Sequence, residues 1–201
     1  TAENHCTIYT IAESPRNEKL IWAGTDDGNL PITRDGGRTW TNVVENVPGL
    51  PPNTWVSFID ASVYDEGTAL VTFDGHNTGD MRPYVFMTAD YGKTWKSLAT
   101  EDIEGYCHCV KQDIVNPDLL FLGTEFGLYV SLDAGSSWAR FKEELPKVAV
   151  HEIAIHPREH DLILATHGRG VQIIDDITPT RHLSRDKLAQ DIVLLASQSA
   201  K

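Results

Sequence analysis

Short apolar runs separated by turn residues recur along the whole chain. Around residues 105–147 the runs are 109–115, 119–122, 128–131 and 137–141, with Gly, Pro, Asn and Asp between them. Within the runs the apolar positions are continuous or alternate with polar ones, as in β-strands, and are not spaced by three or four as in helices. The pattern therefore predicts an all-β chain of four-stranded antiparallel meanders, with a helix only near residues 184–190.

One octet of residues occurs three times, at Thr33–Trp40, Thr88–Trp95 and Ser131–Trp138. Its template is Ser/Thr-X-Asp-X-Gly-X-Ser/Thr-Trp, and five of the eight positions agree in all copies. A short apolar strand ending in Thr precedes each octet and occurs a fourth time at Ile163–Thr166, where the octet has decayed. Repeats of roughly 40 to 50 residues are typical of β-propeller blades. We expect four blades, at about residues 1–50, 51–104, 105–147 and 148–180, followed by a C-terminal segment, 181–201, with a closing strand at 191–196.

The octet has the chemistry of a tight hairpin between the third and fourth strands. Its Asp accepts hydrogen bonds from backbone N–H groups of the turn, and its Gly takes a positive φ without steric cost. Its Trp enters the outer strand, where the ring can pack between neighbouring blades. A catalytic acid is needed once, whereas a turn is needed in every blade, so we interpret the octets as structural. The residues concerned are Asp35, Gly37, Trp40, Asp90, Gly92, Trp95, Asp133, Gly135 and Trp138.

Charge and composition exclude two classes of partner. The chain has 201 residues, 41% of them hydrophobic, and 17 Lys and Arg against 29 Asp and Glu give a net charge of −12. No basic stripe is present to neutralise phosphates, so nucleic acid is a poor partner. The longest uncharged apolar run is 192–196, far below the ~20 residues of a membrane span. We expect a globular protein that does not insert into membranes.

The three cysteines, Cys6, Cys107 and Cys109, are too few for a disulfide framework and lack the second pair of a structural zinc site. We interpret Cys107 and Cys109 as small buried side chains of an inner strand. A bridge from Cys6 to either of them is an open alternative. The chain begins at Thr1 without a signal-peptide pattern, which favours a processed or trimmed sequence.

With its three octets, the chain resembles the Asp-box, or BNR-repeat, β-propellers, which include sialidases, xyloglucanase-type glycoside hydrolases and the sortilin/VPS10 ectodomains. Stretches such as Phe121–Tyr129 and Ala165–Gly170 are similar to those of bacterial BNR-repeat proteins labelled glycosyl hydrolases. The resemblance implies a ring of six to ten blades, an extracellular or periplasmic location, and often a glycan or polypeptide ligand. The sialidase arginine triad and Tyr/Glu nucleophile pair have no match here, so no catalytic residue is carried over.

The loops opposite the Asp boxes are the candidate ligand-binding face. Two carboxylates about 5 to 9.5 Å apart there would suit glycoside hydrolysis. Asp and His together can also hold a divalent cation, although no cofactor motif is present. For Asp26 and Asp27 we favour an ordinary turn, because Asp and Gly tolerate a hairpin's positive φ. The candidate ligand-binding residues are Asp26, Asp27, Asp74, His76, Asp80, Arg82, Glu125, His167 and Arg169.

Three further histidines, His5, His108 and His151, stand near the starts of first strands and can either line a central channel or be unrelated polar residues. They lie ten, nine and six residues before Pro15, Pro117 and Pro157. Because these spacings differ, we favour the second interpretation.

The leading hypothesis is a non-catalytic binding and scaffold module of a secreted BNR-repeat protein, which engages carbohydrate or polypeptide through this loop face. The alternatives are a glycoside hydrolase, sialidase-like or xyloglucanase-like, and an assembly partner in a larger surface complex. Four blades make a narrow ring or an open arc that exposes the outer faces of the first and fourth blades. We therefore expect further blades, from the same longer chain or from a second copy, as partners.

Overall fold

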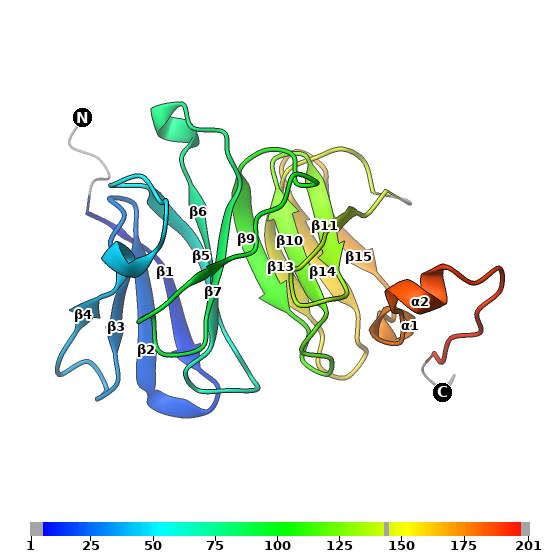
Figure 1. Cartoon of the computed structure of the whole chain (residues 1–201), viewed down its shortest axis with the longest axis horizontal. Helices are drawn as coiled ribbons and strands as arrows, with labels where there is room; N and C mark the ends of the chain where they lie inside the picture. Colours follow the sequence, from blue (N-terminus) through cyan, green and yellow to red (C-terminus); the bar gives the residue numbers. More distant parts are fainter. Residues whose placement is uncertain (1–5, 143–144, 198–201) are drawn as a thin grey trace.

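The computed structural model describes residues 6–142 and 145–197, which form four antiparallel sheets standing side by side (Figure 1). Blade 1 contains β1 (Ile8–Ser14), β2 (Asn17–Thr25), β3 (Pro31–Thr33) and β4 (Thr41–Asn42). Blade 2 contains β5 (Trp55–Ala61), β6 (Ala69–Asp74), β7 (Tyr84–Thr88) and β8 (Lys96–Ser97). Blade 3 contains β9 (Cys107–Gln112), β10 (Leu120–Thr124), β11 (Gly127–Ser131) and β12 (Ala139–Arg140). Blade 4 has three strands in the described residues, β13 (Val150–Ile155), β14 (Leu162–Thr166) and β15 (Gly170–Ile174).

Each sheet is a meander in which neighbouring strands follow one another along the chain. The predicted all-β fold is confirmed, and three of the sheets have the expected four strands. The first strands β1, β5, β9 and β13 pack in succession against one another. Two single-turn 3-10 helices, η1 (Val44–Asn46) and η2 (His76–Thr78), lie in connections.

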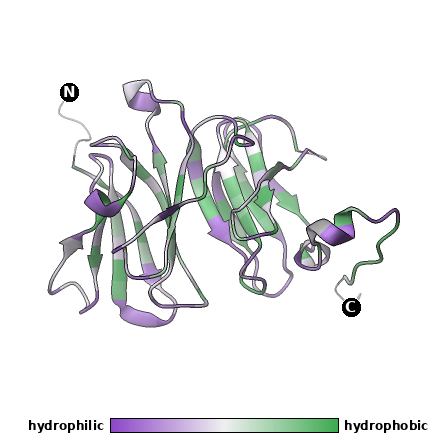
Figure 2. Ribbon diagram, viewed as in Figure 1, coloured by the Kyte–Doolittle hydropathy of each residue, from purple (hydrophilic) through white to green (hydrophobic). Residues whose placement is uncertain are grey.

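The apolar core is divided among the three junctions between blades. One buried cluster joins blades 1 and 2, a second joins blades 2 and 3, and a third joins blades 3 and 4. Figure 2 shows the apolar residues along the strands and the hydrophilic ones at the turns. Burial of apolar surface between blades is therefore what holds consecutive repeats together.

The Asp boxes form the expected hairpins between third and fourth strands. In blade 2 the Asp90 carboxylate accepts hydrogen bonds from the Thr94 N–H (2.8 Å), the Thr94 hydroxyl (2.7 Å) and the Thr88 hydroxyl (2.9 Å). Gly92 takes a φ of +78°, and its N–H donates to the Thr88 hydroxyl oxygen. Asp35 and Asp133 are bonded in the same way. Each of these carboxylates thus accepts hydrogen bonds from its own turn.

The Asp-box tryptophans pack against the preceding blade where there is one. Trp95 contacts Trp22 of blade 1 edge to face, with ring centroids 6.1 Å apart, and Trp138 donates its indole N–H to the Leu98 carbonyl of blade 2 (2.8 Å). Trp95 and Trp138 are buried, whereas Trp40 of blade 1 is 46% exposed. The predicted packing between blades therefore holds for Trp95 and Trp138. It does not hold for Trp40, because no described blade precedes blade 1.

The outer faces of the first and last blades expose apolar side chains, as predicted for an open arc. Ile8 and Ile11 on β1 are 59% and 64% exposed, and Val171 and Ile173 on β15 are 63% and 59% exposed. In the interior blade 3, by contrast, every residue of β10 is buried. These two faces are apolar like the junctions between blades, but no described blade covers them.

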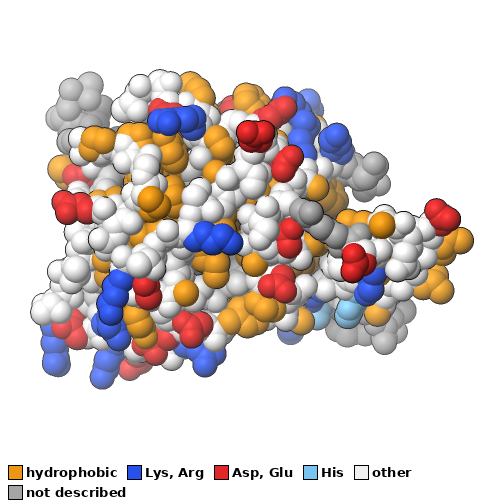
Figure 3. Space-filling model, viewed as in Figure 1, with side chains coloured by type: hydrophobic (Ala, Val, Ile, Leu, Met, Phe, Trp, Pro, Cys, Tyr) orange, Lys and Arg blue, Asp and Glu red, His pale blue; other side chains and the backbone are white. Residues whose placement is uncertain are grey.

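The C-terminal segment differs from the prediction. It contains the short helices α1 (Thr178–Arg181) and α2 (Arg185–Leu188), the second within the predicted helical range. The strand expected at 191–196 is not formed, since residues 191–197 have no regular secondary structure. Strand propensity yields a strand only when a partner edge supplies backbone hydrogen bonds. Figure 3 shows apolar side chains along this segment at the right, where Ile192 and Leu194 are 82% and 96% exposed.

Two further sequence expectations are decided by the fold. Cys107 and Cys109 are fully buried on β9, as predicted. Burial raises the pKa of the Cys107 thiol to about 12 and also raises that of Cys109. All three cysteines are free thiols, so the bridge from Cys6 is not formed. Within the described residues, no helix has the length and apolar character to cross a membrane.

Candidate functional site

Four loops joining second to third strands gather at the end of the molecule opposite the Asp boxes (Figure 1). They follow β2, β6, β10 and β14, and they carry most of the predicted ligand-binding residues. The first strands also begin at this end, because neighbouring strands in a meander run in opposite directions. Side chains from these loops and from the starts of β1, β5, β9 and β13 therefore share one face, which we call the loop face.

The first strand of every blade contains a β-bulge near its start. The pairing register slips by one residue between Ile8 and Thr10, Val56 and Phe58, Cys107 and Cys109, and Val150 and Glu152. A bulge leaves one residue unpaired and redirects its side chain, and bulges are frequent beside functional sites. The four unpaired residues are Tyr9, Ser57, His108 and His151.

All four bulge residues line one small hollow of about 90 Å³ at the inner ends of the blades, together with Trp55, Asp74 and His76. We call it the axial hollow. The favoured interpretation of His108 and His151 as unrelated polar residues is therefore wrong, because the shared bulge brings them to the same place. His5 lies outside the described residues.

Five aromatic rings form a continuous line across blades 2, 3 and 4. The rings of His76 and Tyr106 stack with centroids 4.7 Å apart, and Tyr106 meets His108 edge to face at 5.1 Å. His108 stacks on His151 at 4.0 Å, and His151 lies 5.6 Å from His167. His76 and His167, which the sequence assigned to separate loops, thus stand at the two ends of one line of rings, with Tyr106, His108 and His151 between them.

Two predicted carboxylates flank this line of rings. Asp74 is buried, and its Oδ1 lies 2.7 Å from Nδ1 of His76. Glu125 accepts a hydrogen bond from the Tyr106 hydroxyl (2.9 Å) and lies 3.2 Å from Nε2 of His108. Burial favours the protonated form of Glu125, but these hydrogen bonds outweigh it and lower its pKa. Both carboxylates are therefore held in position by neighbouring polar rings.

The same contacts shift the titration of the rings. Burial raises the pKa of Tyr106 to about 12, and its hydrogen bond to Glu125 acts in the same direction. For His108, burial lowers the pKa, the neighbouring His151 lowers it further, and Glu125 opposes the change. The net effect of these contacts favours the neutral form of the His108 imidazole.

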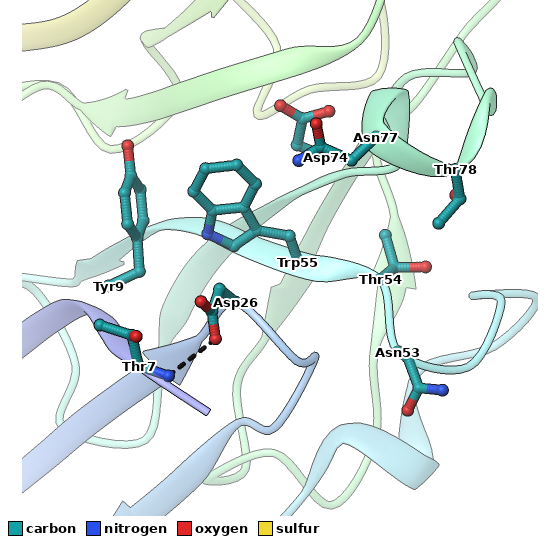
Figure 4. A pocket seen from close by; sticks show the side chains of 9 residues that line it. All are labelled: Thr7, Tyr9, Asp26, Asn53, Thr54, Trp55, Asp74, Asn77 and Thr78. Carbon is teal, nitrogen blue, oxygen red and sulfur yellow. Dashed lines mark hydrogen bonds between the residues drawn. The ribbon is translucent and has the colours of Figure 1, made fainter. Parts of the chain in front are cut away.

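A larger pocket of about 640 Å³ lies beside the axial hollow at the junction of blades 1 and 2 (Figure 4). We call it the Trp55 pocket. It shares Tyr9, Trp55 and Asp74 with the axial hollow, and the rings of Tyr9 and Trp55 meet edge to face at 4.5 Å. Figure 4 shows Asp26, which accepts a hydrogen bond from the Thr7 N–H (2.8 Å), below the Trp55 indole. The other lining residues are Asn53, Thr54, Asn77 and Thr78.

The remaining predicted residues do not line either cavity. Asp27 accepts a hydrogen bond from the Thr25 hydroxyl, which lowers its pKa, and it faces a separate hollow with Gly28 and Asn29. It therefore acts within its own turn, whereas Asp26 of the same turn lines the Trp55 pocket.

Asp80 and Arg82 pair with each other in the loop that follows β6. The Arg82 guanidinium donates two hydrogen bonds to the Asp80 carboxylate (2.9 and 2.7 Å), and these lower the pKa of Asp80. Asp80 also accepts from the Tyr84 hydroxyl. This pair stabilises the loop. The side chain of Arg169 is exposed on the turn beside His167.

Tyr9, Trp55 and Tyr106 are site residues that sequence reasoning missed. One usable signal was present, since Tyr9 lies six residues before Pro15 and His151 lies six before Pro157. The bulge register itself depends on strand pairing between residues distant in the chain. Within the described ranges, no three His, Cys, Asp or Glu side chains are arranged to hold a metal ion.

The fold and its Asp-box hairpins define a partial β-propeller of the BNR type. A family model for Sortilin-Vps10 (sortilin, neurotensin receptor 3) matches residues 83–199, more than half of the chain. The chain therefore belongs to the Sortilin-Vps10 family. A comparison with curated protein sequences gave no match.

The solved structures that share this fold include one named as a binding protein, one named as an enzyme and one with a bound peptide. An auxiliary nutrient binding protein from Bacteroides thetaiotaomicron has a TM-score of 0.65 at 15% identity, covering 90% of this chain and 41% of that one. The GH74 enzyme of Niastella koreensis has a TM-score of 0.61 at 19% identity, covering 86% of this chain and 23% of the enzyme. YCF48 bound to D1 peptide has a TM-score of 0.59 at 16% identity, covering 85% and 52%. The chain thus spans from about a quarter to about half of these structures, and the likeness establishes the fold alone.

Proposed function

We propose that this chain is a binding module, which holds a carbohydrate or polypeptide ligand on its loop face in the Trp55 pocket. One observation carries the proposal: the Trp55 pocket opens beside the axial hollow, into which a bulge in each blade directs one side chain. A concave, largely apolar site with a few convergent polar groups is the usual form of a ligand site. Its volume of about 640 Å³ accommodates several residues of a peptide or sugar units of a glycan.

The contacts of the carboxylates favour binding over catalysis. Asp74 is fixed by His76, and Asp26 is fixed by the Thr7 N–H. The three Asp-box carboxylates serve their own turns at the opposite end. Among the similar structures, one bears the name of a nutrient binding protein and another contains a bound peptide, which supports a binding role.

A glycoside hydrolase is the second candidate, favoured by one observation: two carboxylates, Asp26 and Asp74, line the same pocket. Hydrolysis needs one of them as acid and the other as nucleophile or base. Turnover of chromogenic glycosides that disappears in Asp74→Asn and Asp26→Asn would establish it. Absence of turnover in a protein with the complete set of blades would remove it.

We also propose that further blades, from a longer chain or a second copy, cover the exposed faces of blades 1 and 4. The support is the exposed Asp-box Trp40, together with Ile8 and Ile11 on one face and Val171 and Ile173 on the other. An extracellular or periplasmic location is part of the proposal, and the resemblance to exported Asp-box propellers supports it.

A binding screen tests the main proposal. The folded protein is presented to a glycan array and a peptide array, and positive probes are measured again with Trp55→Ala and Asp74→Ala. His167→Ala and Arg169→Ala probe the far side of the loop face. Loss of binding in Trp55→Ala and Asp74→Ala is expected. Binding that survives all four substitutions would overturn the loop face as the site.

A further inference from the structure

The charges of the Trp55 pocket are unbalanced. Its lining includes the carboxylates of Asp26 and Asp74 and no Lys or Arg side chain. In the described part of the chain, neither carboxylate forms an ion pair with Lys or Arg, and the ring of His76, whose Nδ1 lies 2.7 Å from Oδ1 of Asp74, is the one ion-pair partner found for either of them. The pocket therefore offers negative charge that a ligand can neutralise.

Burial makes this charge selective. The Asp74 side chain is only 5% exposed, so a ligand that fills the pocket removes most of its remaining contact with water. Covering a carboxylate with an apolar group is unfavourable, whereas a cation supplies both a charge-assisted hydrogen bond and an opposite charge that compensate for the lost water. A neutral sugar can donate hydroxyl hydrogen bonds to the carboxylate but brings no positive charge to balance it, and an acidic sugar is repelled.

The two aromatic rings suit the same kind of ligand. Tyr9 and Trp55 stand edge to face at 4.5 Å, on the same side of the pocket as Asp26 (Figure 4). The face of an indole or phenol attracts an ammonium or guanidinium group, and desolvation strengthens the attraction. Carboxylates beside aromatic faces are thus complementary to a side chain with an apolar stem and a cationic end.

We propose that the Trp55 pocket receives a lysine or arginine side chain of a basic polypeptide, with its cationic group between Asp26 and Asp74 and against Trp55. This inference rests on the proposed binding function and names the class of its ligand. The net charge of −12 assists it, because an acidic protein attracts basic partners during diffusional encounter.

Fluorescence anisotropy with a labelled octapeptide of alternating Arg and Gly tests the proposal. The same peptide with Lys in place of Arg should also bind, and the versions with Gln or Glu should not. Asp26→Asn and Asp74→Asn keep the side-chain shape and should each weaken binding at least about tenfold, the equivalent of about 1.4 kcal/mol, since hydrogen bonds to charged groups contribute about that much or more. Trp55→Phe keeps an aromatic face and should bind more tightly than Trp55→Ala.

Glu18→Gln is the matched control, because it removes one exposed negative charge from the start of β2, outside the pocket. It should leave the affinity within about twofold, since exposed charges far from the ligand are screened by salt. If Glu18→Gln weakens binding as much as the pocket variants, attraction to the overall charge explains the result and the proposal is overturned.

A neutral oligosaccharide screen separates this inference from the function on which it rests. If an oligosaccharide binds, is lost in Trp55→Ala and is unaffected by Asp26→Asn and Asp74→Asn, the pocket is a binding site but its basic ligand class is wrong. If no peptide or glycan binds, both the inference and the proposed function fail. Circular dichroism of each variant verifies that it is folded.

Discussion

Arg181 of α1 donates two hydrogen bonds to the carboxylate of Asp113, 68 residues away in blade 3, through Nε (2.9 Å) and Nη2 (2.8 Å). The arginine side chain is 4% exposed and the aspartate is fully buried. The Asn116 amide also donates to the Arg181 carbonyl (3.0 Å). This pair fixes the segment after the last blade onto the turn that follows β9.

Replacing Arg181 by Met should lower the free energy of unfolding by about 3 to 5 kcal/mol, because it leaves the Asp113 carboxylate buried without its cation. Urea unfolding followed by tryptophan fluorescence measures the change. The control is Glu104→Gln, which breaks the exposed ion pair with Lys147 and should cost less than about 1 kcal/mol. If both variants lowered the free energy of unfolding equally, the buried pair would contribute no more to stability than the exposed one.

The Asp-box glycines should differ in their tolerance of a side chain. A Cβ on Gly92 would lie 2.7 Å from Val43 of blade 1, whereas one on Gly37 would lie 3.9 Å from its nearest neighbour. Both residues have positive φ, so Ala is strained at either, but only Gly92→Ala also overpacks a blade junction. We expect Gly92→Ala to cost about 1 to 3 kcal/mol more than Gly37→Ala in urea unfolding. Similar costs would show that the Asp box does not contribute to packing between blades.

Stability should fall in acid because of the Asp boxes. A hydrogen bond from the Thr39 hydroxyl, with further bonds from the turn, lowers the pKa of Asp35 from 3.8 to about 2. Bonds from the Thr94 N–H and hydroxyl lower that of Asp90. A lowered folded-state pKa gives stability that is fully present above the unfolded value and is lost as the pH falls through the folded value. Thermal unfolding between pH 5 and about 2 measures the loss.

Asp35→Asn and Asp90→Asn should each flatten this pH dependence, because an amide does not titrate in that range. An acid response as steep as that of the unmodified protein would assign it to other carboxylates.

The exposed end faces should drive association. In light scattering, a chain with only these four blades should form dimers or larger assemblies, because Ile11 and Val171 expose apolar area typical of an interface. Ile11→Lys should shift the population toward monomer, whereas Ile192→Lys in the C-terminal segment should not. A stable monomer at all concentrations would contradict a second copy as the partner.

The blades were predictable because their signals are local. Thr88 and Thr94 donate hydrogen bonds to Asp90, and the Gly92 N–H donates to Thr88, so the polar groups of the octet are satisfied within one hairpin wherever it recurs. The tryptophans were only partly predictable, because the burial of Trp95 and the exposure of Trp40 depend on whether another blade stands before them.

The candidate site was predictable only in outline. The common location of Asp74, His76 and Glu125 follows from the order of strands and loops, because alternate loops of a meander lie at the same end. The axial hollow does not, because His108 and His151 converge through bulges set by pairing with β10 and β14. No motif singles out Trp55 in the sequence, and it becomes part of a pocket through its contact with Tyr9 on the neighbouring blade.

The most direct test of a ligand site at the junction of blades 1 and 2 is the indole N–H spectrum of the protein labelled with ¹⁵N. The chain has five tryptophans and therefore five such signals. On titration with the alternating Arg-Gly octapeptide, the signal assigned through Trp55→Phe should move and saturate, while that of Trp40 at the Asp-box end should stay in place. Saturable binding that leaves the Trp55 signal unmoved would contradict the account.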